Sequence, residues 1–150
     1  MLAGCKKDKQ QSNEPEPTKP TTYTVSYKVL DVDLVGDTLS DCFKIDVTYT
    51  NAKGESVNLT DQKLPWIMSF EVENPFHAEM TGKFTYKEEE LPEKVMYGQR
   101  FGIIIQNSTY LDGNVNGGFA DLTKEKFLLL YGGENAHKLE FTASKDLKLD

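Results

Sequence analysis

Residues 43–59 read FKIDVTYTNAKGESVNL, and this stretch decides the fold class. From Phe43 to Tyr49 apolar residues alternate with polar ones, which is the pattern of a strand with one buried and one solvated face. Residues 51–54 then supply a tight turn, in which Gly54 allows a positive φ. Val57 and Leu59 continue on the return strand, so the stretch predicts an antiparallel hairpin.

The same period of two recurs on both sides of this hairpin. It is found in residues 23–29, 68–72, 76–86 and 101–105, and residues 139–141 are predicted as a further short strand. Residues 87–93 read as a charged connection. Residues 123–131 predict either another strand or a short helix capped by Thr123. The prediction is an all-β domain over residues 23–150, a single antiparallel, immunoglobulin-like β-sandwich of about seven or eight strands.

The first 22 residues have a different composition. Leu2-Ala3-Gly4-Cys5 resembles the lipobox of bacterial lipoproteins, in which the cysteine becomes the lipidated N-terminus. Residues 1–5 are therefore predicted to be the remnant of a lipoprotein signal, with a lipid anchor on Cys5. The alternative is a cytosolic protein that begins with four chance residues. The lipobox interpretation places the protein in the bacterial cell envelope, at the outer membrane.

Residues 6–22 contain no aromatic or aliphatic side chain. They cannot bury enough surface to offset the entropy of ordering, so a disordered linker is predicted. Its three prolines favour an extended chain with a reach on the order of 50 Å. Such a linker would hold a folded domain clear of the lipid headgroups.

Tyr27-Lys28-Val29, the hairpin of residues 45–54, and Leu64-Pro65-Trp66 followed by Phe70 carry a resemblance to a known family. In these features residues 23–86 resemble the mycobacterial membrane protein small family. The resemblance implies a β-sandwich domain outside the cytoplasm and a role in assisting lipid-exporting transporters. Members of that family are tethered by a transmembrane helix, whereas the lipobox predicts a lipid tether here.

Two candidate sites stand out within the domain. Trp66 is the only tryptophan, and it can either fill the core of the sandwich or stack on a ligand. Residues 112–117, DGNVNG, match the first six positions of the calcium pattern D-x-[DN]-x-[DN]-G. The candidate metal ligands are Asp112, Asn114 and Asn116; the position of the bidentate glutamate is taken by Thr123. A plain wide turn is the alternative, because turns also favour Asn and Gly.

The sequence offers little sign of catalysis. His77 and His137 are the only histidines and have no metal-binding spacing, and Cys42 lacks the context of a catalytic nucleophile. Residues 88–90 are adjacent glutamates, which point in different directions and cannot act as a pair. The chain is therefore predicted not to be an enzyme and to need no cofactor, calcium being the one candidate ion.

The charge of the domain restricts its partners. Residues 6–22 hold four of the 17 basic and three of the 24 acidic residues, which leaves a net charge of −8 on residues 23–150. A domain this acidic repels phosphate backbones, so nucleic acid is excluded as a partner. The prediction is a membrane-anchored envelope lipoprotein acting as a non-enzymatic binding or accessory module for an envelope protein, glycan or lipid. The family resemblance adds an association with transport to this prediction. The alternatives are an envelope hydrolase with an unrecognised site and a calcium-dependent glycan-binding module.

Overall fold

The computed structural model describes residues 20–30 and 42–150. The predicted lipidation site Cys5, the signal remnant 1–5 and residues 6–19 of the predicted linker lie outside the described residues. The last linker position, Thr22, already begins the first strand.

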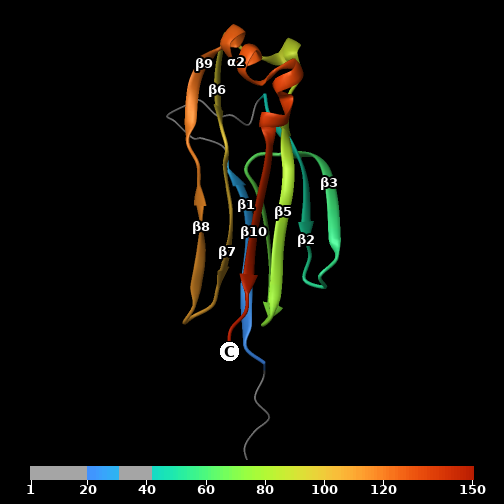
Figure 1. Cartoon of the computed structure of the whole chain (residues 1–150), viewed down its shortest axis with the longest axis vertical. Helices are drawn as coiled ribbons and strands as arrows, with labels where there is room; N and C mark the ends of the chain where they lie inside the picture. The colour runs from blue at the N-terminus through green and yellow to red at the C-terminus, as the bar shows by residue number, and fades with distance from the viewer. Residues whose placement is uncertain (1–19, 31–41) are drawn as a thin grey trace, which may run out of the picture.

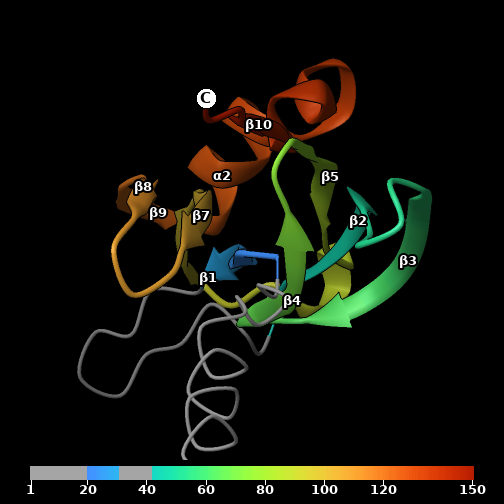
Figure 2. The same ribbon diagram turned by 90° about the horizontal axis from the view of Figure 1, so that it is seen from below.

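Ten strands are found in the described part of the chain, and they form two four-stranded sheets and a two-stranded extension (Figures 1 and 2). The sheets have the strand orders β4-β1-β7-β8 and β10-β5-β2-β3, and β6 pairs with β9. All pairs are antiparallel. The bounds are β1 (Thr22–Leu30), β2 (Lys44–Thr50), β3 (Ser56–Lys63), β4 (Trp66–Glu73), β5 (Phe76–Thr85), β6 (Lys94–Gly98), β7 (Arg100–Gln106), β8 (Leu111–Asn116), β9 (Phe119–Thr123) and β10 (Glu140–Leu147).

The prediction of an all-β antiparallel sandwich is confirmed, but it missed strands in the second half. β6 and β7 pair with β9 and β8 in one continuous register, from Lys94 opposite Thr123 to Gln106 opposite Leu111. These four strands thus form a single long hairpin, whose upper part extends beyond the four-stranded sheet (Figure 1).

The core lies between the inner faces of the two sheets, where the alternating apolar residues meet. Its largest fully buried side chains are aromatic or long: Tyr27, Phe43, Phe84, Phe127, Ile45 and Met80. The Tyr27 hydroxyl donates to the Thr50 carbonyl at 2.8 Å, which satisfies its polar group inside the core. Burial raises the pKa of Tyr27 to about 12, because it disfavours the phenolate.

Residues 124–131 form the helix α2 (Lys124–Tyr131), so the helical alternative is confirmed and the strand alternative is wrong. The Thr123 side chain caps the helix by accepting a hydrogen bond from the Lys126 backbone N–H at 3.2 Å. Phe127 anchors it in the core against Phe43 and Tyr97. Two short 3-10 helices, η2 (Glu88–Glu90) and η3 (Gly133–Leu139), complete this end of the molecule.

The two ends of the sandwich differ. β1 begins at the end where the C-terminus lies, and α2 lies at the opposite end (Figure 1). A chain that enters at Thr22 therefore presents the helical end away from its point of entry. No helix in the described ranges has the length and apolarity needed to cross a membrane.

Candidate functional site

The outer face of the sheet β10-β5-β2-β3 carries ordered rows of polar side chains. Thr48 of β2 lies opposite Thr81 of β5, and Thr81 lies opposite Thr142 of β10. Residues opposite each other on neighbouring strands point to the same face, so the three hydroxyl groups form a row across three strands. In the same way Asp46, Lys83 and Glu140 form the next row.

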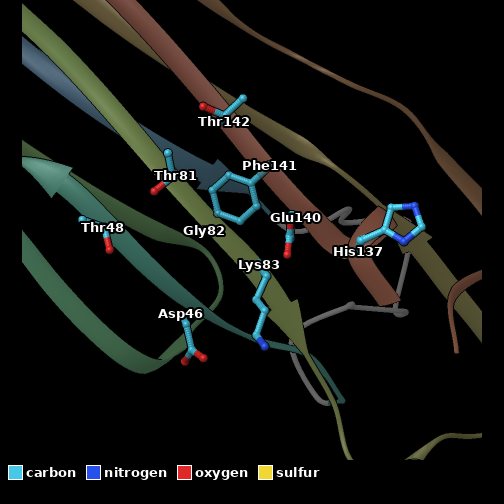
Figure 3. Close-up of a pocket in the computed structure, with 9 residues that line it drawn as sticks. All are labelled: Asp46, Thr48, Thr81, Gly82, Lys83, His137, Glu140, Phe141 and Thr142. Carbon is cyan, nitrogen blue, oxygen red and sulfur yellow. The ribbon is translucent and has the colours of Figure 1, made fainter. Parts of the chain in front are cut away.

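A groove of about 610 Å³ lies over these two rows (Figure 3). The overhanging η3 contributes His137 to its lining. In Figure 3 Lys83 lies between the two carboxylates, Asp46 on one side and Glu140 on the other. The lining thus combines hydroxyl groups, two carboxylates and one ammonium group on a rigid sheet. We call it the sheet groove.

Gly82 and Phe141 also line the sheet groove. A Cβ atom at Gly82 would lie 2.4 Å from the Asp46 carbonyl oxygen and 2.7 Å from Cζ of Phe141, so only glycine fits. The Phe141 ring packs against Gly82 and is 5% exposed, and it contacts Phe84 and Phe101 in the core. The groove is therefore backed by the packed core.

One carboxylate of the sheet groove is held in place by the backbone. Asp46 Oδ1 accepts a hydrogen bond from the backbone N–H of Asp61 at 2.9 Å. The pairing of β2 with β3 shifts register between Ile45 and Val47, and Asp61 has a φ of 57°. This bulge orients Asp46, whereas Lys83 takes part in none of the ion pairs within the described residues. The ammonium group of Lys83 is thus available to a ligand.

His77 lies on the same strand as Thr81 and Lys83, outside the sheet groove. Its Nδ1 lies 2.5 Å from Asp146 Oδ1 and its Nε2 lies 3.5 Å from Glu79 Oε2. These carboxylates raise the pKa of His77 above 6.5, the hydrogen bond to Asp146 being the main cause. The side chain is 55% exposed, so solvent screens this effect.

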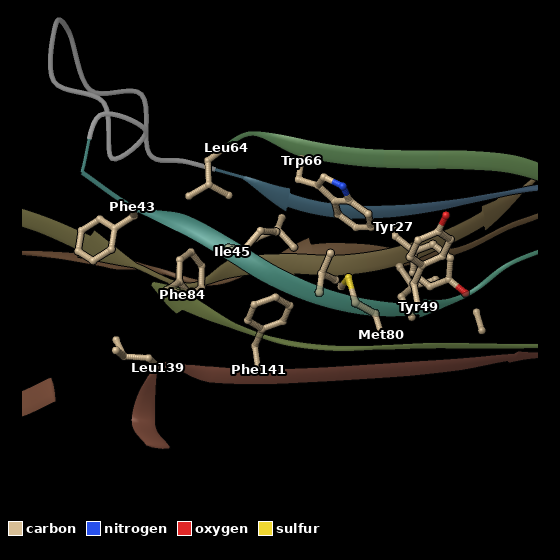
Figure 4. Close-up of a cluster of buried hydrophobic side chains, with 14 of the residues drawn as sticks. Tyr27, Phe43, Ile45, Tyr49, Leu64, Trp66, Met80, Phe84, Leu139 and Phe141 are labelled. Atoms are coloured by element: carbon tan, nitrogen blue, oxygen red, sulfur yellow. The ribbon is translucent and has the colours of Figure 1, made fainter. Parts of the chain in front are cut away.

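Trp66 lies in the core of the sandwich (Figure 4), which is the first of the two roles predicted for it. It is 6% exposed, and its ring centroid lies 5.6 Å from that of Tyr49. This burial confirms the core position. A ligand contact through Trp66 stays a prediction that needs the indole to become accessible.

The three candidate calcium ligands lie on strand β8, where a loop or wide turn was expected; that expectation was wrong. Asp112, Asn114 and Asn116 are alternate residues opposite Ile105, Ile103 and Phe101, so they share the inward-facing row of an edge strand. Asp112 Oδ1 already accepts a hydrogen bond from Lys145 Nζ at 3.1 Å. Calcium binding at these residues stays a prediction. Among the described residues, no group of three or more His, Cys, Asp or Glu side chains could hold a metal ion.

Sequence reasoning missed the residues of the sheet groove. Thr48, Thr81 and Thr142 occupy the polar positions of alternating strands, where solvated side chains are ordinary. Their meeting in one row depends on the pairing of three strands from distant parts of the chain. The one available signal was Gly82, a glycine inside a predicted strand, which often marks a close approach of another group.

Comparisons with known proteins give no family assignment: no family model matches the chain, and no curated protein is significantly similar to it.

Proposed function

We propose that this chain is a membrane-anchored envelope lipoprotein, a non-enzymatic binding or accessory module whose sheet groove binds a polyhydroxylated ligand such as a glycan. The observation that carries the proposal is the double row of hydroxyl and charged side chains over three strands, within an open groove of about 610 Å³. Pockets of roughly 300–1,000 Å³ are typical of small-ligand sites.

The lining of the groove supports a glycan over a lipid chain. Threonine hydroxyl groups both donate and accept hydrogen bonds, and carboxylates accept them, which suits the many hydroxyl groups of a sugar. The apolar ring nearest the groove, Phe141, is almost fully covered by the core and offers little surface to an acyl chain. The sheet needs no rearrangement to present these groups, so little ordering entropy opposes binding.

A lipid anchor on Cys5 is the second part of the proposal. It rests on the lipobox and on the composition of residues 6–22. The fold is compatible with it, since the chain enters at Thr22, opposite the helical end (Figure 1). An anchored domain would therefore display α2 and η3 outward from the membrane. The resemblance to the mycobacterial membrane protein small family adds a transport partner to this proposal.

Binding is tested by calorimetry of the full chain with a panel of neutral and acidic oligosaccharides. Thr81→Val removes the central hydroxyl at nearly constant shape, and it should weaken binding at least about tenfold, the effect of roughly 1.4 kcal/mol. Thr60→Val is the matched control, because Thr60 is an exposed threonine of β3 in the same sheet and is not among the groove residues. Equal affinity of the two variants would remove the sheet groove as the site.

The anchor is tested separately by mass spectrometry of the protein from its native membrane. Acyl chains on Cys5 are expected, and Cys5→Ser should release the protein from the membrane fraction. An unmodified chain that retains Met1 would contradict the anchor and leave the glycan proposal standing.

A hydrolase is the second candidate, favoured by the two carboxylates on either side of Lys83 (Figure 3). Asp46 and Glu140 belong to strands separated by β5, which puts their Cα atoms about 9–10 Å apart by strand spacing. Inverting glycosidases hold their two carboxyl groups about 6.5–9.5 Å apart, a separation that side chains on strands at this Cα spacing can reach. Turnover of the bound oligosaccharide that is lost in Glu140→Gln would establish the hydrolase instead.

A further inference from the structure

The long hairpin has one strand edge that no other described strand pairs with. β8 pairs only with β7 and β9 pairs only with β6, so nothing in the described part of the chain pairs with the outer edge of residues 111–123. Leu111 is 69% exposed and Phe119 is 45% exposed. We call this the hairpin edge. Its unused N–H and C=O groups form a template for another strand.

Natural proteins usually protect such edges with lysine, proline or bulges. The edge strand β3, for comparison, ends in Lys63 and pairs with β2 through a bulge. Residues 111–123 contain no lysine, arginine or proline, and their only charges are those of Asp112 and Asp121. The hairpin edge therefore lacks these protections. Asp112 is paired with Lys145, so the charge that faces an incoming strand is that of Asp121, and together with the net charge of −8 on residues 23–150 it favours a basic partner strand.

Gly118 is a second, independent observation. Each other glycine described in the structure has a positive φ or a backbone or side-chain atom where a Cβ would lie. Gly118 has neither: its φ is not positive, and nothing lies within 4 Å of its missing Cβ. Nothing in the described chain therefore requires glycine there. Gly118 lies between β8 and β9, and the absence of a side chain there leaves the adjoining pocket open.

A pocket of about 570 Å³ adjoins Gly118. It is lined by Tyr97, Gly98, Gln99, Gly118, Phe119, Ala120, Tyr131 and Lys138. Ala120 lies opposite Tyr97 and shares its face, and its small side chain leaves the space beside the ring open. On a strand added to β9, the side chain in line with Tyr97 and Ala120 would fill this space.

The polar groups of the pocket are already fixed. The Gln99 amide nitrogen donates to the Tyr97 hydroxyl and to the Lys138 carbonyl, both at 2.9 Å. The Tyr97 and Tyr131 rings lie 4.7 Å apart. A pocket with aromatic walls and a preset polar floor suits one large apolar side chain.

We propose that the hairpin edge binds an extended segment of a partner protein by β-strand addition at β9, with one large apolar side chain in the pocket beside Gly118 and with basic residues flanking it. Backbone hydrogen bonds give such complexes their affinity, and pockets for alternate side chains give them specificity. The proposal concerns a surface separate from the sheet groove and does not depend on glycan binding.

The probe is the acetylated and amidated peptide Lys-Thr-Lys-Thr-Phe-Thr-Lys-Thr-Lys, titrated into the full chain by calorimetry. Saturable binding is expected. Gly118→Val places a branched side chain in the pocket that the apolar side chain of the peptide would fill, and it should weaken binding at least about tenfold. Ala52→Val is the matched control, since Ala52 is an exposed small residue of the β2–β3 turn, and its affinity should be unchanged.

Two altered peptides separate backbone pairing from general attraction. N-methylation of alternate residues removes the backbone donors and should abolish binding, and Phe→Ala should weaken it by emptying the pocket. These peptides need no protein variant, so the test holds even if Gly118→Val does not fold. No heat at about 1 mM peptide, or equal binding of the N-methylated peptide, would overturn the proposal. A dimer seen by light scattering and lost in Gly118→Val would assign the edge to a second copy instead.

Discussion

The two sides of the sandwich are closed in different ways. On one side the chain itself passes from β3 to β4, and so from one sheet to the other, and the buried Leu64 and Trp66 fill the junction. On the other side β10 and β8 are both edge strands, and an ion pair between Lys145 and Asp112 joins them. We call the first the closed side and the second the open side. The closed side should supply stability, whereas the open side keeps polar and backbone groups available for binding.

Replacing Trp66 by alanine should have the largest effect. The indole is almost fully buried against Tyr49, so Trp66→Ala should lower the free energy of unfolding by about 3–5 kcal/mol. Urea denaturation followed by circular dichroism measures this. Phe119→Ala is the control on the open side, and its cost should stay below about 1 kcal/mol because the ring is 45% exposed. Equal costs would mean that the two sides contribute equally, and the comparison would fail.

The closed side is also the part that the sequence predicts well. The strands around Tyr27, Ile45 and Phe70 largely alternate, because one face packs against the core and the other is mostly polar. Trp66 follows the same logic, since a large apolar ring in such a strand gains most from burial. Local pattern and tertiary packing agree here, so the pattern alone predicts the structure.

The open side was missed for a physical reason. The inward-facing residues of β8 are Asp112, Asn114 and Asn116, and an edge strand that extends past its neighbouring sheet has no apolar core to face. Their alternation therefore carries no hydrophobic signal, and Asn with Gly reads as a turn. Gly113 adds to this turn pattern, although it lies within β8, where its φ is 111°. The sheet groove was missed for another reason, since its rows depend on strand register.

Removing the Tyr27 hydroxyl should have the next largest effect. Tyr27→Phe leaves the partly buried Thr50 carbonyl without this donor, and it should cost about 1–2 kcal/mol in urea denaturation at pH 7. The raised pKa, about 12, means that the folded state favours the neutral phenol. Its contribution to stability is therefore complete below about pH 10 and is lost as the pH rises toward 12. A variant with an unchanged alkaline unfolding midpoint would contradict this assignment.

The ion pair on the open side should contribute less. Lys145 and Asp112 are 25% and 45% exposed, so Asp112→Asn should lower the free energy of unfolding by about 0.5–1 kcal/mol, and more at low salt than at high salt. A double-mutant cycle with Lys145→Met isolates the pair from other effects. A coupling energy as large as the cost of Trp66→Ala would show that the two sides are closed with equal strength.

The same variants decide the calcium prediction. A calcium ion at Asp112 would compete with the ammonium group of Lys145, so Lys145→Met should strengthen calcium binding if the site exists. Calorimetric titration of the wild type and of this variant measures it directly. Absence of heat in both, with no shift in melting temperature, would remove Asp112, Asn114 and Asn116 as metal ligands.

The smallest effect should come from His77, which joins β5 to β10 within one sheet through Asp146. Because the folded-state pKa of His77 is raised above 6.5, its interaction stabilises the fold fully below about pH 6.5 and is lost as the pH rises through the folded-state pKa. His77→Gln should therefore lower the melting temperature slightly at pH 5.5 and leave it unchanged at pH 8.5. Asp146→Asn is the control, and in an NMR titration it should move the pKa of His77 back toward its ordinary value. An effect of His77→Gln on the melting temperature that is equal at both pH values would mean that the imidazole stabilises the fold through packing and not through its charge.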